Sequence, residues 1–125
     1  MGRLNYLGFV ASLIMVAPGL ARAKDANLMA DVRCVIIGVR MMGAGQNASL
    51  KTAGLMLDLY YLGRLDGRDP HFDLEDAIAA QLPKMSQSDY AANARRCGRS
   101  LQLKGAQITM IGKDLIRRGH AMQKK

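Results

Sequence analysis

The chain has 125 residues, with 18 lysines and arginines against 10 aspartates and glutamates, and a formal net charge of +8. It contains no tryptophan and only two phenylalanines, so it lacks the aromatic platform on which nucleic-acid bases stack. No phosphate-binding loop, nucleophile elbow or metalloprotease helix occurs in it. These features argue against nucleic acid as a partner and against enzymatic activity, and they predict neither a cofactor nor a metal centre.

The first 23 residues have the three-part layout of a secretory signal peptide. The basic segment Met1-Gly2-Arg3 precedes an apolar run from Leu4 to Leu20, and the small-x-small pattern Ala21-Arg22-Ala23 follows. This layout predicts cleavage between Ala23 and Lys24 and export to the periplasm. Because the apolar run is nearly long enough to span a bilayer, retention as an uncleaved anchor is the alternative. After cleavage, residues 24–125 form one domain without a membrane span.

Helical spacing begins directly after the cleavage site. Between Lys24 and Met42, apolar side chains recur at steps of four and three residues, which places one apolar stripe along a helix: Leu28, Val32, Val35, Val39 and Met42. Glycines in the segment 43–47 end this helix. A second helix is expected from Ala48 to Leu65, with Asn47 or Ser49 as its N-cap. Since it is apolar nearly all round, we expect it to be the central helix, buried on several sides.

Two further helices follow a turn at residues 65–70, where Gly67 and Pro70 end the second helix. Asp73 is expected to cap a short third helix, and Ser86 to open the last helix with a capping box. One face of the last helix carries an apolar stripe of Tyr90, Ala94, Cys97, Leu101, Ile108 and Leu115. Its length predicts a kink or a break at Gly98 or Gly105, since glycine weakens a helix interior. The fold class is therefore all-α, a small four-helix domain.

Cys34 and Cys97 are the only cysteines in the chain. In an exported protein they predict one structural disulfide, which joins the first helix to the last. Closing a loop of this length contributes about 4 kcal/mol in the chain-entropy model, a large share of the about 5–10 kcal/mol expected for a small domain. A reactive thiol pair is the alternative, but such pairs usually lie close together in sequence.

Charge is unevenly distributed along the chain. From Asp58 to Asp89 there are seven acidic and three basic residues, whereas from Tyr90 to Lys125 nine basic residues accompany Asp114 alone. This asymmetry indicates an anionic partner, either an envelope protein or the anionic envelope surface. The alternative is a solvated helix face that complements the acidic middle of the same chain. The candidate partner-binding basic face consists of Arg95, Arg96, Arg99, Lys104, Lys113, Arg117 and Arg118.

Three groups of residues in the sequence carry side chains of the kinds that bind metal ions or take part in catalysis. The acidic residues from Asp66 to Asp76 do not match the calcium-binding EF-hand spacing, and helix capping and turn formation explain them better. His71 and His120 lie in no catalytic or metal motif. The methionines lack the spacing of a copper site and are typical of adaptable core packing, although thioether sulfur does bind Cu(I).

The segment Tyr60-Tyr61-Leu62-Gly63-Arg64-Leu65-Asp66-Gly67-Arg68-Asp69-Pro70, with one cysteine on either side, resembles a group of short exported proteins from sphingomonad-type alphaproteobacteria. The resemblance extends from about Cys34 to Leu101 and implies a periplasmic location, without implying an activity. The helix order is also similar to that of HdeA-type periplasmic acid-stress chaperones. That second similarity is topological, and no residue motif carries their function over.

The sequence thus predicts a non-enzymatic periplasmic protein that binds another macromolecule, as a stress chaperone or as an inhibitor of an envelope or secreted protein. The alternative is a periplasmic copper-binding protein, or a small enzyme whose site has no recognisable motif. The oligomeric state is left open.

Overall fold

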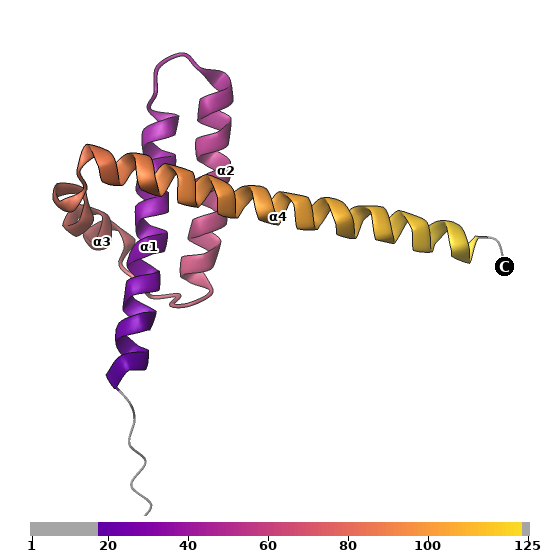
Figure 1. Ribbon diagram of the computed structural model, residues 1–125, viewed down its shortest axis with the longest axis horizontal. Helices are drawn as coiled ribbons and strands as arrows, with labels where there is room; N and C mark the ends of the chain where they lie inside the picture. Colours follow the sequence, from indigo (N-terminus) through magenta and orange to yellow (C-terminus); the bar gives the residue numbers. More distant parts are fainter. Residues whose placement is uncertain (1–17, 124–125) are drawn as a thin grey trace, which may run out of the picture.

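The computed structural model describes residues 18–123, with side chains from residue 26 onward. This part of the chain forms α1 (Pro18–Met42), α2 (Ala48–Asp66), α3 (Leu74–Gln81), a single turn of 3₁₀-helix η1 (Leu82–Lys84) and α4 (Gln87–Met122) (Figure 1). These residues contain no strand, which confirms the predicted all-α, four-helix fold. Most of the predicted signal peptide lies outside the described residues. Helix α1 begins within it, so cleavage after Ala23 would shorten α1 to residues 24–42.

Helices α1 and α2 form an antiparallel hairpin, and glycines bring their backbones into close contact. A Cβ on Gly54 would lie 2.6 Å from the carbonyl oxygen of Gly38, so the two helices cross where neither has a side chain. The connecting turn uses Gly45, whose φ of +59° favours glycine. Asn47 then caps α2, and its side chain accepts a hydrogen bond from the backbone N–H of Leu50 at 3.0 Å.

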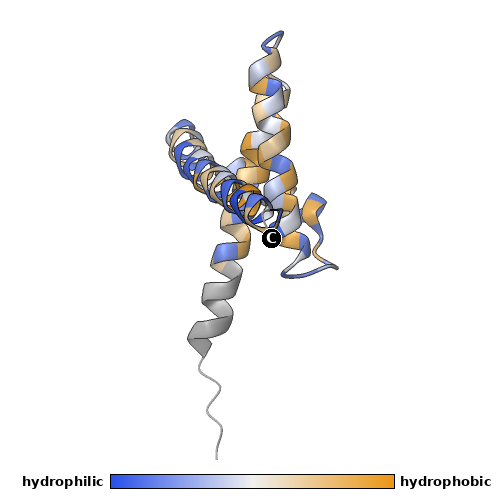
Figure 2. Ribbon diagram, turned by 90° about the vertical axis from the view of Figure 1, so that its right-hand side faces the viewer, coloured by the Kyte–Doolittle hydropathy of each residue, from blue (hydrophilic) through white to orange (hydrophobic). Residues whose placement is uncertain are grey.

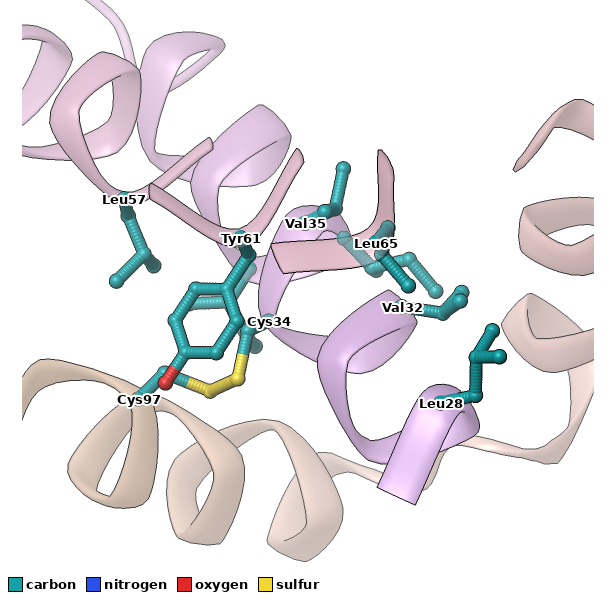
Figure 3. Packing of buried hydrophobic residues seen from close by; sticks show 10 residues of the cluster. Leu28, Val32, Cys34, Val35, Leu57, Tyr61, Leu65 and Cys97 are labelled. Atoms are coloured by element: carbon teal, nitrogen blue, oxygen red, sulfur yellow. A yellow bond between two sulfur atoms is a disulfide. The ribbon is translucent and has the colours of Figure 1, made fainter. Parts of the chain in front are cut away.

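The buried core is centred on α1, which packs against α2, α3 and α4. Its members are Leu28, Val32, Cys34, Val35, Ile36 and Ile37 from α1, Leu57, Tyr61 and Leu65 from α2, and Cys97 from α4 (Figure 3). The prediction that the second helix is central was therefore wrong. Helix α2 buries only the face toward α1 and α4, while Leu55, Met56 and Leu59 on its other side are about half exposed or more. When a helix is apolar on all sides, burial of each side is favourable. The sequence does not show whether other helices are present to cover every side.

The caps predicted for the last two helices are confirmed. The Asp73 side chain accepts a hydrogen bond from the backbone N–H of Asp76, and Ser86 with Asp89 forms a complete capping box at the start of α4. The predicted kink or break in α4 was wrong, because the helix continues through Gly98 and Gly105 to Met122 and α4 runs nearly straight (Figure 1). Glycine costs about 1 kcal/mol in a helix interior without interrupting its hydrogen-bond ladder.

Helix α4 crosses the α1–α2 hairpin steeply, and its C-terminal half extends away from the rest of the protein (Figure 1). Hydrophilic and hydrophobic residues alternate along it (Figure 2). Within residues 18–123, no helix combines the length and the hydropathy needed to cross a membrane.

Candidate functional site

The disulfide holds α4 against the middle of α1. Cys34 and Cys97 are both fully buried and bonded, with their Cα atoms 5.7 Å apart, which confirms the predicted bridge. The ring of Tyr61 points from α2 toward it (Figure 3). Next to Cys97, the guanidinium of Arg96 donates a hydrogen bond of 2.7 Å to the carbonyl oxygen of Ala30. The same nitrogen lies 3.0 Å from the sulfur of Cys34, so covalent and polar contacts together fix this crossing.

A buried carboxylate joins α1 to the end of α2. Asp31 is 1 % exposed, and its Oδ2 accepts hydrogen bonds from Arg64 at 3.0 Å and from Arg68 at 2.7 Å. Burial opposes the charged form of Arg64, but its contacts with Tyr60 and Asp31 outweigh this and raise its pKa. Sequence reasoning missed this cluster. An aspartate inside an apolar helix stripe, with two arginines in the motif at residues 60–70, was the available signal.

A second polar contact holds α3 against α1. Gln81 is buried, and its side-chain oxygen accepts a hydrogen bond from Arg33 at 3.1 Å. Its amide nitrogen donates to the sulfur of Met29 at 3.6 Å. This gives Met29 a structural role, while other methionines, such as Met56 and Met122, are exposed on separate helices.

Asp58 is the one described carboxylate that is buried without a hydrogen bond to its inner oxygen. It is 4 % exposed and lies against Gly38 at the α1–α2 crossing, where its Oδ1 has no partner. Burial raises the pKa of this carboxyl from 3.8 to about 6, because removal from water disfavours the charged form. Asp58 lines neither of the two surface hollows that adjoin α4, and we interpret it as a determinant of stability.

The predicted basic face divides into two groups on α4. At 3.6 residues per turn, four of the seven residues fall on one line along the helix: Arg95, Arg99, Lys113 and Arg117. We call this the basic line, and all four side chains belong to exposed residues. Lys104 and Arg118 lie nearer to the opposite side of the helix. Arg96 is directed to α1 by its hydrogen bond to Ala30.

Two surface hollows adjoin α4. The larger, of about 770 Å³, is lined among the described residues by α4 alone, including Arg95 and Arg99. The smaller, of about 310 Å³, lies where α1, the α1–α2 turn and the start of α4 meet, and Arg40 covers the ring of Tyr90 at 4.1 Å beside it. Neither hollow brings together a nucleophile and a base. Among the side chains that the structure describes, from residue 26 to residue 123, no three or more His, Cys, Asp or Glu are placed to hold a metal ion.

No family model, curated protein or solved structure matches the chain. The resemblances based on residues 60–70 and on helix order therefore stay predictions. The structure adds one point about that segment: Arg64 and Arg68, both within it, bind the buried Asp31, so part of the motif serves the packing of α2 on α1.

Proposed function

We propose that this protein is an exported, non-enzymatic binding protein that holds an anionic macromolecule of the cell envelope along the basic line of α4. The observation that carries the proposal is the unbalanced charge of this helix. Helix α4 contains seven arginines and lysines against two acidic residues, Asp89 and Asp114. Asp89 caps the helix and Asp114 pairs with Arg117 at 2.9 Å, so most of the positive charge has no acidic partner among the described residues.

The geometry of the basic line favours an extended partner. Arg95 and Arg99 are one turn apart, as are Lys113 and Arg117, and about four turns separate Arg99 from Lys113. At 1.5 Å per residue the line is about 33 Å long, which is the scale of a protein surface rather than of a small molecule. Exposed charges of one sign raise the association rate with an oppositely charged partner and make binding dependent on salt.

An acidic envelope protein is the form of partner we favour, held either as an unfolding client or as a native target. A client complex should delay aggregation of the client, because exposed leucine, isoleucine and methionine side chains would contact its apolar segments. A native target should instead co-purify in a fixed molar ratio. Comparing client light scattering with the stoichiometry of the purified complex distinguishes the two forms.

The test is capture of envelope proteins by immobilised protein with the disulfide intact. Two double variants are matched in charge: R95Q/R99Q removes two charges from the basic line, and K51Q/K84Q removes two exposed charges from elsewhere. We expect the wild type and K51Q/K84Q to retain the same acidic protein and to release it at about 1 M salt, where the Debye length is about 3 Å. R95Q/R99Q should retain much less.

Equal retention by all three proteins, or retention that high salt leaves unchanged, would refute the role of the basic line. A parallel sedimentation with vesicles of phosphatidylethanolamine and phosphatidylglycerol tests the other anionic surface. Binding to these vesicles, together with failure to capture a protein, would assign the basic line to the envelope surface instead.

A further inference from the structure

The side of α4 opposite the basic line carries an apolar stripe of which only the first half is covered. Tyr90 and Leu101 pack against the core, and Cys97 bonds to α1. At 3.6 residues per turn, the same side of the helix continues past the hairpin as Ile108, Ile111, Leu115 and Met122. These four residues are 68 %, 51 %, 61 % and 74 % exposed. We call residues 104–122 the arm. Its stripe continues a contact already made within the protein, but nothing among the described residues covers it.

Glycines border this stripe at a fixed interval. Gly105, Gly112 and Gly119 recur every seven residues beside the apolar side chains, and a Cβ added to any of them would meet no atom within 4 Å. Each exposed helical glycine costs about 1 kcal/mol relative to alanine, so the arm is a weak helix by itself. Elsewhere in this protein, Gly38 of α1 and Gly54 of α2 allow these two helices to touch through their backbones. A seven-residue repeat of apolar and small residues is likewise typical of a seam that meets another helix.

The outer face of α2 has the complementary properties. Leu55, Leu59 and Asp66 lie along one side of α2, and Leu62 on the same side is partly buried against the core. Leu55 and Leu59 are 49 % and 63 % exposed. The apolar stripe of this face ends in an acidic residue, Asp66, which is exposed.

The stripe of the arm follows the same order with opposite charge. Ile108, Ile111 and Leu115 are followed by Arg118, at steps of three, four and three residues. The steps along α2 are four, three and four, so the two rows differ in detail but have nearly the same length. A parallel alignment of the two helices therefore places the three leucines of α2 against the two isoleucines and the leucine of the arm. It also brings Arg118 close to Asp66 at the end of α2. An antiparallel pair of two arms would instead bring basic residues of one arm to the basic residues of the other, which repel.

We propose that the occupant of the outer face of α2 is the arm of a second copy of this chain, and that two copies exchange arms in a two-fold dimer. Within one copy, α2 and α4 cross at a wide angle (Figure 1). Consider a two-fold axis that bisects the angle between α2 and α4. Rotation by 180° about this axis turns the direction of α2 into the direction of α4. Each arm therefore runs parallel to α2 of the other copy, and both contacts form at the same time. Such an isologous arrangement closes on itself and uses the two surfaces twice.

Both surfaces of each copy are used in this arrangement. Each copy contributes the stripe side of one arm and the outer side of α2, so the same contact forms twice in one dimer. The basic line stays on the outside of this dimer. The inference therefore goes beyond the proposed function, and either one can fail without the other.

Sedimentation equilibrium of the purified, oxidised protein tests the proposal. We expect a dimer whose dissociation constant rises at least about 30-fold in Leu115→Glu and in Leu59→Glu, since both side chains would lie at the centre of the contact. Ala106→Glu adds the same charge to the opposite side of the arm and should leave the dimer intact. All three positions are exposed, so each variant should keep the helical circular dichroism of the wild type.

A charge exchange identifies the docking surface. Arg118→Glu and Asp66→Lys should each weaken the dimer about five-fold, as expected for partly exposed charges, and the double variant R118E/D66K should recover the wild-type affinity. A protein that is monomeric up to about 100 µM would overturn the proposal. So would a dimer that Leu59→Glu leaves unchanged, or one that the double variant fails to restore, because both results would place the arm on another surface.

Discussion

Replacing Asp58 with asparagine should stabilise this protein at neutral pH and make its stability depend less on pH. The carboxyl group is 4 % exposed, lies against Gly38 and has no hydrogen-bond partner for its inner oxygen. Burial raises its pKa from 3.8 to about 6. The amide of asparagine has nearly the same size and shape but carries no charge at any pH, so the variant removes the cost of the buried ion while keeping the packing of α1 on α2.

The shift gives both the magnitude and the direction of the effect. Between pH 3.8 and about 6 the folded protein holds a proton that the unfolded chain has released, so stability falls as the pH rises through this window. The stabilisation that the neutral carboxyl provides is fully present below pH 3.8, and it is lost above about pH 6. A shift of about two pKa units corresponds to about 3 kcal/mol. We expect Asp58→Asn to gain about 2–3 kcal/mol at pH 7 and almost nothing near pH 4.

Urea denaturation followed by circular dichroism measures this at a series of pH values for the wild type, Asp58→Asn and the exposed control Glu75→Gln. Other carboxylates titrate in the same range, but they do so in all three proteins, and the difference between wild type and variant isolates position 58. The reasoning is refuted if Asp58→Asn is less stable than the wild type at pH 7, or if the difference between them is the same at every pH.

Three further changes test the structure by the same denaturation measurement. Replacing both Cys34 and Cys97 with serine should lower the free energy of unfolding by about 4 kcal/mol, and an unchanged value would mean that the bridge does not constrain the unfolded chain. Asp31→Ala should cost about 2–3 kcal/mol, because two partly buried arginines lose their shared partner; a loss below about 0.5 kcal/mol would show that this cluster behaves as an ordinary surface pair. Gly38→Ala should destabilise, since its Cβ would overlap the buried carboxyl on α2. Gly98→Ala, which meets no atom within 4 Å, should instead stabilise by about 0.5–1 kcal/mol, and the opposite order of these two variants would contradict the helix crossing.

The features that the sequence predicted correctly are those set by local chemistry. Asn47, Asp73 and Ser86 cap their helices as expected, because a side-chain oxygen three residues before a free backbone N–H needs no distant partner. The disulfide was predictable for a different reason, since two cysteines in an exported chain leave a single pairing. Export, cellular location and function are not tested by the fold, and they stay predictions.

The features that the sequence did not reveal depend on contacts between distant segments. The pairing of Asp31 with Arg64 and Arg68 spans more than thirty residues, and no local pattern shows that these groups meet. The choice of α1 over α2 as the central helix is of the same kind. Both helices are rich in apolar residues, and α1 is central because α2, α3 and α4 all pack against it.

Helix α4 shows how far a periodic pattern can be interpreted. Its apolar side runs from Tyr90 through Leu101 to Leu115, with Lys104 as one charged residue within it, so the sequence predicts one apolar side for the whole helix. In the structure the first half of that face meets α1 and α2, while the second half extends beyond them (Figure 1). A periodic apolar pattern indicates that burial of one side of the helix is favourable. It does not indicate whether the surface that covers this side belongs to the same molecule or to another. The seven-residue spacing of Gly105, Gly112 and Gly119 adds that the missing surface is a helix which approaches closely. Because α2 offers an exposed apolar face that ends in Asp66, a second copy would supply that helix from a surface that the protein already has.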